Sequence, residues 1–153
     1  MRLAVHALKF GGRERIAHVL GALAADLWVR PGELEGYVAV VPVPLSRKRQ
    51  RERGFNQAEL IARAVSQNAA IPIRGRLLVK KRDCPPQAGL SVSARRKNVA
   101  SVYRASIPRL LRGRDFLVVD DVLTTGATAE AAARALRRAG AGAVDVLTLA
   151  RVL

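Results

Sequence analysis

Short, unbroken apolar runs alternate along the chain with segments whose apolar residues recur at helical spacing. The runs at 37–43, 77–79, 116–119 and 144–149 predict strands. The run at 116–119, β-branched at its end, suits a strand buried on both faces of a parallel sheet. The helical pattern predicts helices at 1–10, 13–29, 56–66 and from 127 or 128 to about 139. Strands alternating with helices in this way predict an α/β fold with parallel strands.

The pattern predicts a single domain over residues 1–153, because the length is ordinary for one domain. Residues 1–30 would form an N-terminal helical segment. Residues 82–98 carry two prolines, a glycine and several serines with little apolar periodicity, so we expect a long flexible loop over about 80–98. Loops of this kind often act as lids. Residues 99–105 would then return as an extended stretch to the sheet.

Composition narrows the setting of the protein. Half of the residues are apolar, which is enough for an ordinary core, yet no apolar run approaches a membrane span. The start lacks the pattern of a signal peptide. The single cysteine, Cys84, excludes a disulfide within the chain and a cysteine cluster for a metal. We therefore expect a cytoplasmic protein without a membrane span.

The charge is strongly positive, with 27 Lys and Arg residues against 12 acidic ones and a formal net charge of +15. Arginine supplies most of it, and its planar fork binds phosphate with two parallel hydrogen bonds. Polyanionic partners are predicted: phosphorylated small molecules, nucleic acid, or both. An arginine-rich proteome would give the same bias without any such partner, and the sequence leaves both explanations open.

The stretch 116–128 places two adjacent carboxylates between an apolar run and an alanine-rich helical pattern. Unpaired N–H groups at the start of a helix favour an anion, threonine hydroxyls can donate to it, and a glycine lets the backbone approach it. The carboxylates can accept bonds from a vicinal diol, directly or through a hydrated Mg²⁺. A site for a phosphorylated sugar is therefore predicted. The alternative, a plain strand-to-helix turn capped by Thr128, leaves Asp120, Asp121, Thr124 and Thr125 unexplained.

A very basic segment, 46–54, follows the strand predicted at 37–43. We expect a loop here, at the carboxyl end of a strand, which is the edge where open α/β sheets bind ligands. It can share a crevice with Asp120, and a second phosphate-sized anion would suit it. A solvated basic loop without a ligand is the alternative.

The stretch 116–128 resembles the 5-phosphoribosyl-1-pyrophosphate (PRPP) motif of type I phosphoribosyltransferases. The resemblance implies a three-layer α/β fold in which helices flank a central, mainly parallel sheet. It also implies Mg²⁺ as cofactor and displacement of pyrophosphate from C1 of PRPP by a nitrogen acceptor. The catalytic pair, facing the ribose hydroxyls and Mg²⁺, would be Asp120 and Asp121. The residues implied for the 5′-phosphate are Thr124, Thr125, Gly126, Ala127 and Thr128. Those implied for pyrophosphate are Pro44, Leu45, Ser46 and Arg47, with Lys80, Lys81 and Arg82 from the lid.

A narrower resemblance, to the ComF-like branch of this family, extends over nearly the whole chain. It rests on residues 41–46 and 51–57, with 7–10 similar to the branch's opening helix and 87–91, 95–96 and 98–99 similar to its mid-chain loop. That branch is tied to competence and DNA uptake. Its full-length members often begin with a zinc-binding cysteine segment, which this chain lacks. We expect either a short variant or a longer native N-terminus.

The acceptor is not evident from the sequence. Some purine transferases of this class keep an acidic general base where this chain has Thr124, and aromatic residues for a base-stacking hood make up only 4% of the chain. Three functions stay open: a PRPP-dependent transferase, a competence protein that binds single-stranded nucleic acid, and a module that senses PRPP without turnover. The oligomeric state is open too, with a homodimer as one alternative.

Overall fold

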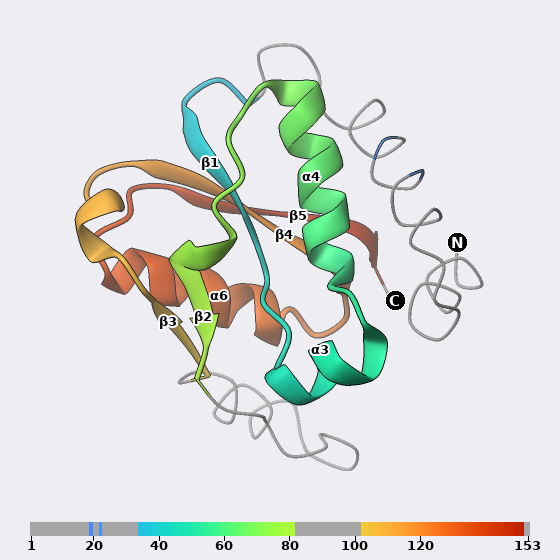
Figure 1. Cartoon of the computed structure of the whole chain (residues 1–153). Coiled ribbons are helices and arrows are strands. Elements are labelled where there is room, and N and C mark those ends of the chain that lie inside the picture. Colours follow the sequence, from blue (N-terminus) through green and yellow to red (C-terminus); the bar gives the residue numbers. More distant parts are fainter. Residues whose placement is uncertain (1–18, 20–21, 23–33, 82–101, 152–153) are drawn as a thin grey trace.

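The computed structural model describes residues 34–81 and 102–151, together with Val19 and Ala22. Both of these isolated residues are helical, within the helix expected at 13–29. The remainder of that helix, the helix expected at 1–10 and most of the expected lid lie outside the described residues. The elements run in the order β1 (Tyr37–Pro42), α3 (Arg47–Arg53), α4 (Gln57–Ala69), η1 (Gly75–Leu77), β2 (Leu78–Lys80), β3 (Tyr103–Ala105), η2 (Pro108–Leu110), β4 (Asp115–Leu123), α6 (Ala127–Arg138) and β5 (Val144–Arg151) (Figure 1).

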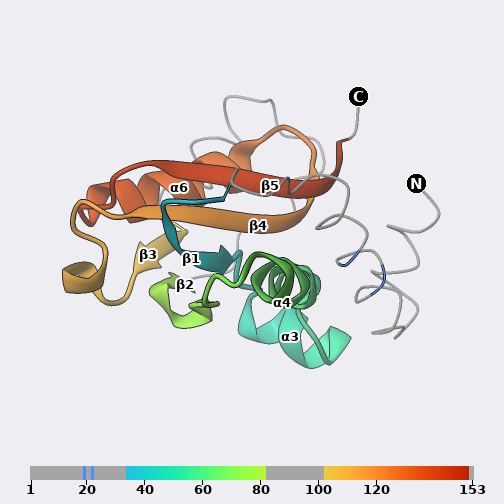
Figure 2. The same ribbon diagram turned by 90° about the horizontal axis from the view of Figure 1, so that it is seen from above.

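A parallel sheet in the order β1-β4-β5 forms the centre of the fold. Ile73 extends it on the outer side of β1 through a parallel bridge to Val40. α4 packs against one face of the sheet and α6 against the other, while α3 follows the carboxyl end of β1 (Figure 1 and Figure 2). This confirms the α/β architecture expected from the alternating pattern and the three layers implied by the resemblance.

Two apolar cores, one on each face of the sheet, follow from the period of two along the strands. Val41 and Val118 point to one side, where they are fully buried with Leu136 of α6. Val40, between its neighbours on β1, points to the other side and packs with Ile61 of α4. Each such buried side chain contributes about 1.5–3 kcal/mol through removal of apolar surface from water. Packing on both faces therefore holds the sheet in place, so the segments at its edges have defined positions from which to form a site.

The extended stretch expected at 99–105 does not return to the central sheet, and this expectation is wrong. β3 pairs antiparallel with β2 in a separate two-stranded sheet. Tyr103 and Ala105 are buried in the core beneath α6, so burial of alternate side chains, rather than pairing with the central strands, sets the place of β3.

The basic segment 46–54, expected as a loop, is a helix for most of its length. Ser46 caps α3 by accepting a hydrogen bond from the Arg49 amide (3.2 Å). Gly54 ends the helix with φ 78°, and its amide donates to the Gln50 carbonyl (3.0 Å). Arg, Lys, Gln and Glu are good helix formers, but the segment has no apolar stripe, so the periodicity did not reveal it.

The remaining predicted strands and helices lie within one residue of their expected positions, except that α4, β4 and β5 continue further than expected. β4 continues four residues past the apolar run, through Asp120 to Leu123, because β5 continues to pair with it. α4 begins after Asn56 and runs to Ala69. Within the described part of the chain, no helix combines the length and apolar character needed to cross a membrane.

Candidate functional site

The register of the parallel strands aligns the two segments that were predicted to bind anions. Pro42 is paired with Val119, and the Val43 amide donates to the Val119 carbonyl (2.9 Å). The segment that begins at Pro44 therefore leaves β1 at the level where Asp120 follows in β4. Both segments lie at the carboxyl edge of the sheet, where open α/β sheets bind their ligands.

The β4–α6 loop ends at a helix whose first turn is free of side-chain caps. Gly126 is the N-cap residue with φ 75°, and no side chain accepts from the first amides of α6. The Gly126 carbonyl accepts a hydrogen bond from the Glu130 amide (2.8 Å). Thr124 is exposed, while Thr125 and Thr128 are half-buried. This end of a 12-residue helix presents N–H groups and hydroxyls to an anion.

The acidic pair lies within β4 rather than in the loop after it. Successive side chains leave a strand on opposite faces, so Asp120 projects towards the α6 face and Asp121 towards the α4 face. The Asp121 amide donates to Asp120 Oδ1 (2.9 Å), which orients the first carboxylate. A single ion at this edge would take one of the two directly, in keeping with Mg²⁺ sites that use one or two carboxylates and complete their octahedron with waters and substrate phosphates.

The second anion segment lies at the end of β1. Pro44 and Leu45 are half-buried between β1 and α3, and Ser46 is buried because its hydroxyl caps that helix. Arg47 is the first residue of α3. Because this segment follows the end of β1 and α6 follows the end of the neighbouring strand β4, a ligand that reached both would lie along the carboxyl edge of the sheet, near Asp120.

The small sheet pairs the residues on either side of 82–101, the segment where a lid is expected. Lys80 closes β2, and the Lys81 amide donates to the Val102 carbonyl (2.8 Å). The Lys81 side chain is exposed. Lys80 is half-buried and already interacts with another residue of the protein. Arg82 lies outside the described residues, so its predicted contact with pyrophosphate stays a prediction.

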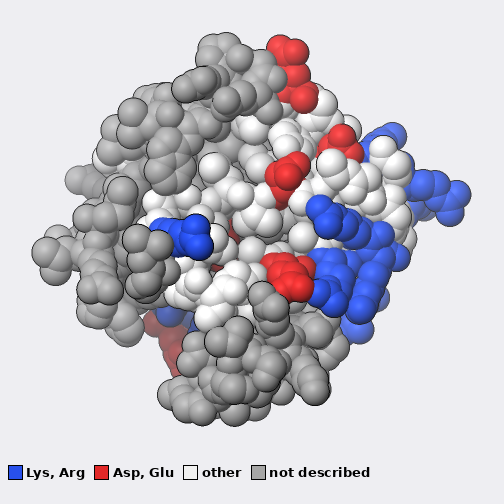
Figure 3. Space-filling view, turned by 180° about the vertical axis from the view of Figure 1, so that it is seen from behind, with Lys and Arg blue, Asp and Glu red and all other residues white. Residues whose placement is uncertain are grey.

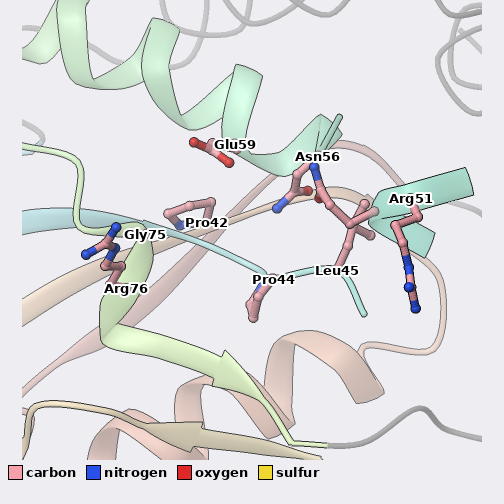
Figure 4. A pocket seen from close by; sticks show the side chains of 9 residues that line it. Pro42, Pro44, Leu45, Arg51, Asn56, Glu59, Gly75 and Arg76 are labelled. Carbon is pink, nitrogen blue, oxygen red and sulfur yellow. The ribbon is translucent and has the colours of Figure 1, made fainter. Parts of the chain in front are cut away.

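A pocket of about 700 Å³ adjoins the Pro44 segment (Figure 4). It is lined by Pro42, Pro44, Leu45, Gln50, Arg51, Asn56, Glu59, Gly75 and Arg76. Its volume is suited to a small molecule, and Figure 4 shows Arg51 and Arg76 on opposite sides of Pro44 and Leu45. None of these lining residues belongs to the stretch 120–128, so the pocket extends the predicted pyrophosphate segment and not the phosphate loop.

Asn56 is a residue of this region that the sequence reasoning did not single out. Its Oδ1 accepts from the Ala58 amide (3.1 Å), which caps α4, and its Nδ2 donates to the Val43 carbonyl (3.0 Å). It therefore ties the start of α4 to the end of β1. An Asn directly before a helical pattern is an N-cap signal, but the bond to Val43 has no local signal.

The model of the phosphoribosyl transferase domain family matches residues 52–152 of the chain. The chain belongs to the phosphoribosyltransferase family. Within this family it groups with the ComF-like branch. The chain is 34% identical over 152 residues to the DNA utilization protein YhgH of Escherichia coli K12. The alignment covers 97% of this chain and 66% of that protein. It is 34% identical over 114 residues to competence protein F of Haemophilus influenzae, covering 74% of this chain and 50% of the relative. This chain thus spans about half to two thirds of the length of these relatives.

Solved structures show the same fold. The glutamine PRPP amidotransferase from B. subtilis matches with a TM-score of 0.58 and 22% identity, over 87% of this chain and 26% of that one. A structure of the allosteric regulatory enzyme of purine biosynthesis matches with a TM-score of 0.58 and 23% identity, over 87% of this chain and 25% of the other. The expected phosphoribosyltransferase fold is confirmed.

Proposed function

We propose that this protein binds PRPP with Mg²⁺ and transfers the phosphoribosyl group to a nitrogen acceptor, releasing pyrophosphate. The observation that supports the proposal is that the two segments predicted to bind anions lie at one edge of the sheet, at the ends of the paired strands β1 and β4, with Asp120 and Asp121 in β4. A single phosphate would need only one such segment. PRPP carries a phosphate at one end and a pyrophosphate at the other, so it is suited to lie across this edge.

The roles follow from that orientation. The 5′-phosphate binds the first turn of α6 and the hydroxyls of Thr124, Thr125 and Thr128. The ribose lies over the end of β4, where Asp120 and Asp121 accept from its hydroxyls. Pyrophosphate lies against Pro44 to Arg47, and we assign the cations of Lys80, Lys81 and Arg82 to it as further partners.

In the reaction, the acceptor nitrogen forms a bond to C1 as the bond from C1 to pyrophosphate breaks. The electron pair leaves with pyrophosphate, and the nitrogen gives its proton to water. Mg²⁺ supplies positive charge that stabilises the departing pyrophosphate. The protein's own contribution is to fix the ribose and to surround the leaving group with positive charge.

Calorimetric titration of PRPP in the presence of Mg²⁺ tests binding. For Asp120→Asn/Asp121→Asn we expect at least a tenfold loss of affinity, corresponding to about 1.4 kcal/mol. Removing two negative charges would by simple electrostatics tighten the binding of an anion, so a loss points to the diol and the metal ion. The matched control is Glu35→Gln, an exposed carboxylate in the turn before β1, which should leave affinity unchanged. Equal affinity in the double variant and the unmodified protein would overturn the assignment.

Transfer is tested separately from binding. Pyrophosphate release is measured with a panel of nucleobases and amines, each with PRPP and Mg²⁺. Release with one acceptor, abolished in Asp120→Asn/Asp121→Asn, supports transfer. PRPP binding without release for any acceptor contradicts transfer and favours the sensing module.

A role in handling DNA is the second candidate function. It is supported by the similarity to DNA utilization and competence proteins and by the net charge of +15. A filter-binding titration with single-stranded DNA across salt concentrations tests it, since neutralisation of phosphates gives a steep salt dependence.

A further inference from the structure

Two segments far apart in sequence form one rigid corner at the amino edge of the sheet. The Gly113 amide donates to the Gly140 carbonyl (2.8 Å), and the Gly142 amide donates to the Arg114 carbonyl (2.8 Å). A Cβ on Gly140 would lie 3.6 Å from the Arg112 Cα. These interactions hold the turn before β4 against the residues that follow α6.

Five exposed arginines project from this corner: Arg109, Arg112, Arg114, Arg137 and Arg138. We call them the amino-edge arginine surface. None of the five has an ion pair with another residue in the described part of the chain. Figure 3 shows Lys and Arg side chains gathered over the corresponding side of the molecule.

The fold accounts for only part of this charge. Arg137 and Arg138 lie in the last turn of α6, where a cation is stabilised by the helix dipole, and Arg137 also donates to the Val144 carbonyl (3.1 Å). Arg109, Arg112 and Arg114 lie on η2 and the turn after it, where no such dipole acts on them. Like charges gathered on one corner repel one another, and a bound anion would relieve that repulsion.

The surface is separate from the proposed PRPP site. It lies where β4 and β5 begin, whereas the phosphate loop and the Pro44 segment lie where β4 and β1 end. β4 alone is nine residues long. Because a strand rises about 3.3 Å per residue, the two ends of β4 lie roughly 25 Å apart. A ligand at the carboxyl edge therefore does not neutralise these arginines.

We propose that the amino-edge arginine surface binds the phosphate backbone of a nucleic acid. The inference deepens the second candidate function by naming the surface that would serve it. Several arginine forks on a rigid corner suit repeated phosphates, each taken by two parallel hydrogen bonds. The two segments of the corner, 107–115 and 137–144, contain no aromatic residue that could stack on bases, so binding depends on charge and not on base sequence.

Binding of fluorescent DNA of mixed sequence, single-stranded and duplex, tests the proposal across a range of salt concentrations. In Arg112→Glu/Arg138→Glu, which changes both segments, we expect affinity to fall more than tenfold. The slope of log affinity against log salt should become shallower by about 2, roughly one for each phosphate that is no longer neutralised. Arg112→Gln/Arg138→Gln should give the same change in slope with a smaller loss of affinity.

The matched control is Arg63→Glu/Arg151→Glu, two exposed arginines on α4 and the end of β5. It makes the same change in net charge elsewhere, so equal losses in both double variants would overturn the proposal. Tighter binding to anionic vesicles than to DNA in the same buffer, abolished in the Arg112/Arg138 variants, would also overturn it. PRPP titration of the same proteins keeps the two proposals distinct, because these variants should bind PRPP normally whether or not they bind DNA.

Discussion

At the scale of the residue, Gly126 connects backbone conformation with anion binding. Its φ of 75° disfavours any side chain, although a Cβ would meet only Leu123 Cδ1 at 3.9 Å. We expect Gly126→Ala to lower the free energy of unfolding by about 1–3 kcal/mol through backbone strain. It should also weaken PRPP binding, because a methyl group would stand where the phosphate approaches the first turn of α6.

Gly113→Ala separates these two effects. Gly113 has φ 67° with nothing within 4 Å of a Cβ, so its strain should match, but it lies at the opposite edge of the sheet. Chemical denaturation should give similar losses for both variants, and calorimetry should give a loss of PRPP affinity for Gly126→Ala alone. A parallel loss of affinity in Gly113→Ala would show that the effect at Gly126 is only one of stability.

The site residues predicted from the sequence illustrate what a motif can provide. It predicted a strand, two carboxylates and a hydroxyl-rich turn before a helix, and the structure has β4, with Asp120 and Asp121, followed by α6. It did not reveal that the two carboxylates leave opposite faces, because the apolar run ends at Val119 while pairing with β5 carries the strand to Leu123. That extension depends on a strand that lies beyond α6 along the chain, which no local pattern encodes.

At the scale of the element, Asn56 joins α4 to the end of β1. The side chain is 8% exposed and both of its polar atoms are bonded. We expect Asn56→Ala to cost about 1 kcal/mol for the missing cap, and about 1–3 kcal/mol more because the Val43 carbonyl loses its donor. Asn56→Ser keeps a capping oxygen and loses only the bond to Val43, so denaturation should place it between Asn56→Ala and the unmodified protein. A Ser variant as unstable as the Ala variant would show that the cap contributes nothing.

The sequence pattern predicted those helices and strands that bury one face periodically. β1, α4, β4, α6 and β5 each bury an apolar face, so their residues carry the period. α3 buries no such stripe, and β3 is three residues long, too short for a period to show. Ser46 and Gly54 were nevertheless visible as a helix start and stop, so capping signals around a basic run could have identified α3.

At the scale of the whole molecule, the order β1-β4-β5 puts the first and last described strands on either side of the central one. Tyr37 joins them, because its hydroxyl donates to Asp145 Oδ2 (2.6 Å). That hydrogen bond, with burial and the charges of Asp145 and Asp115, raises the pKa of Tyr37 from its ordinary 10.0 to about 12. The pairing of sequence-distant ends is a consequence of topology, and neither residue shows it alone.

This raised pKa gives the fold an alkaline limit with a defined sign. The unfolded chain loses the Tyr37 proton near pH 10, while the folded protein keeps it to about pH 12. The contribution of the hydrogen bond to stability is therefore complete below pH 10 and is lost as the pH rises through that window. In Tyr37→Phe, which has no proton to lose, the difference in unfolding free energy from the unmodified protein should be constant from pH 7 to pH 9 and should shrink above pH 10. Urea denaturation at each pH measures it, and subtraction of the two proteins removes the titration of lysines common to both. A difference that stays constant up to pH 12 would show that the Tyr37 hydroxyl does not hold β1 to β5.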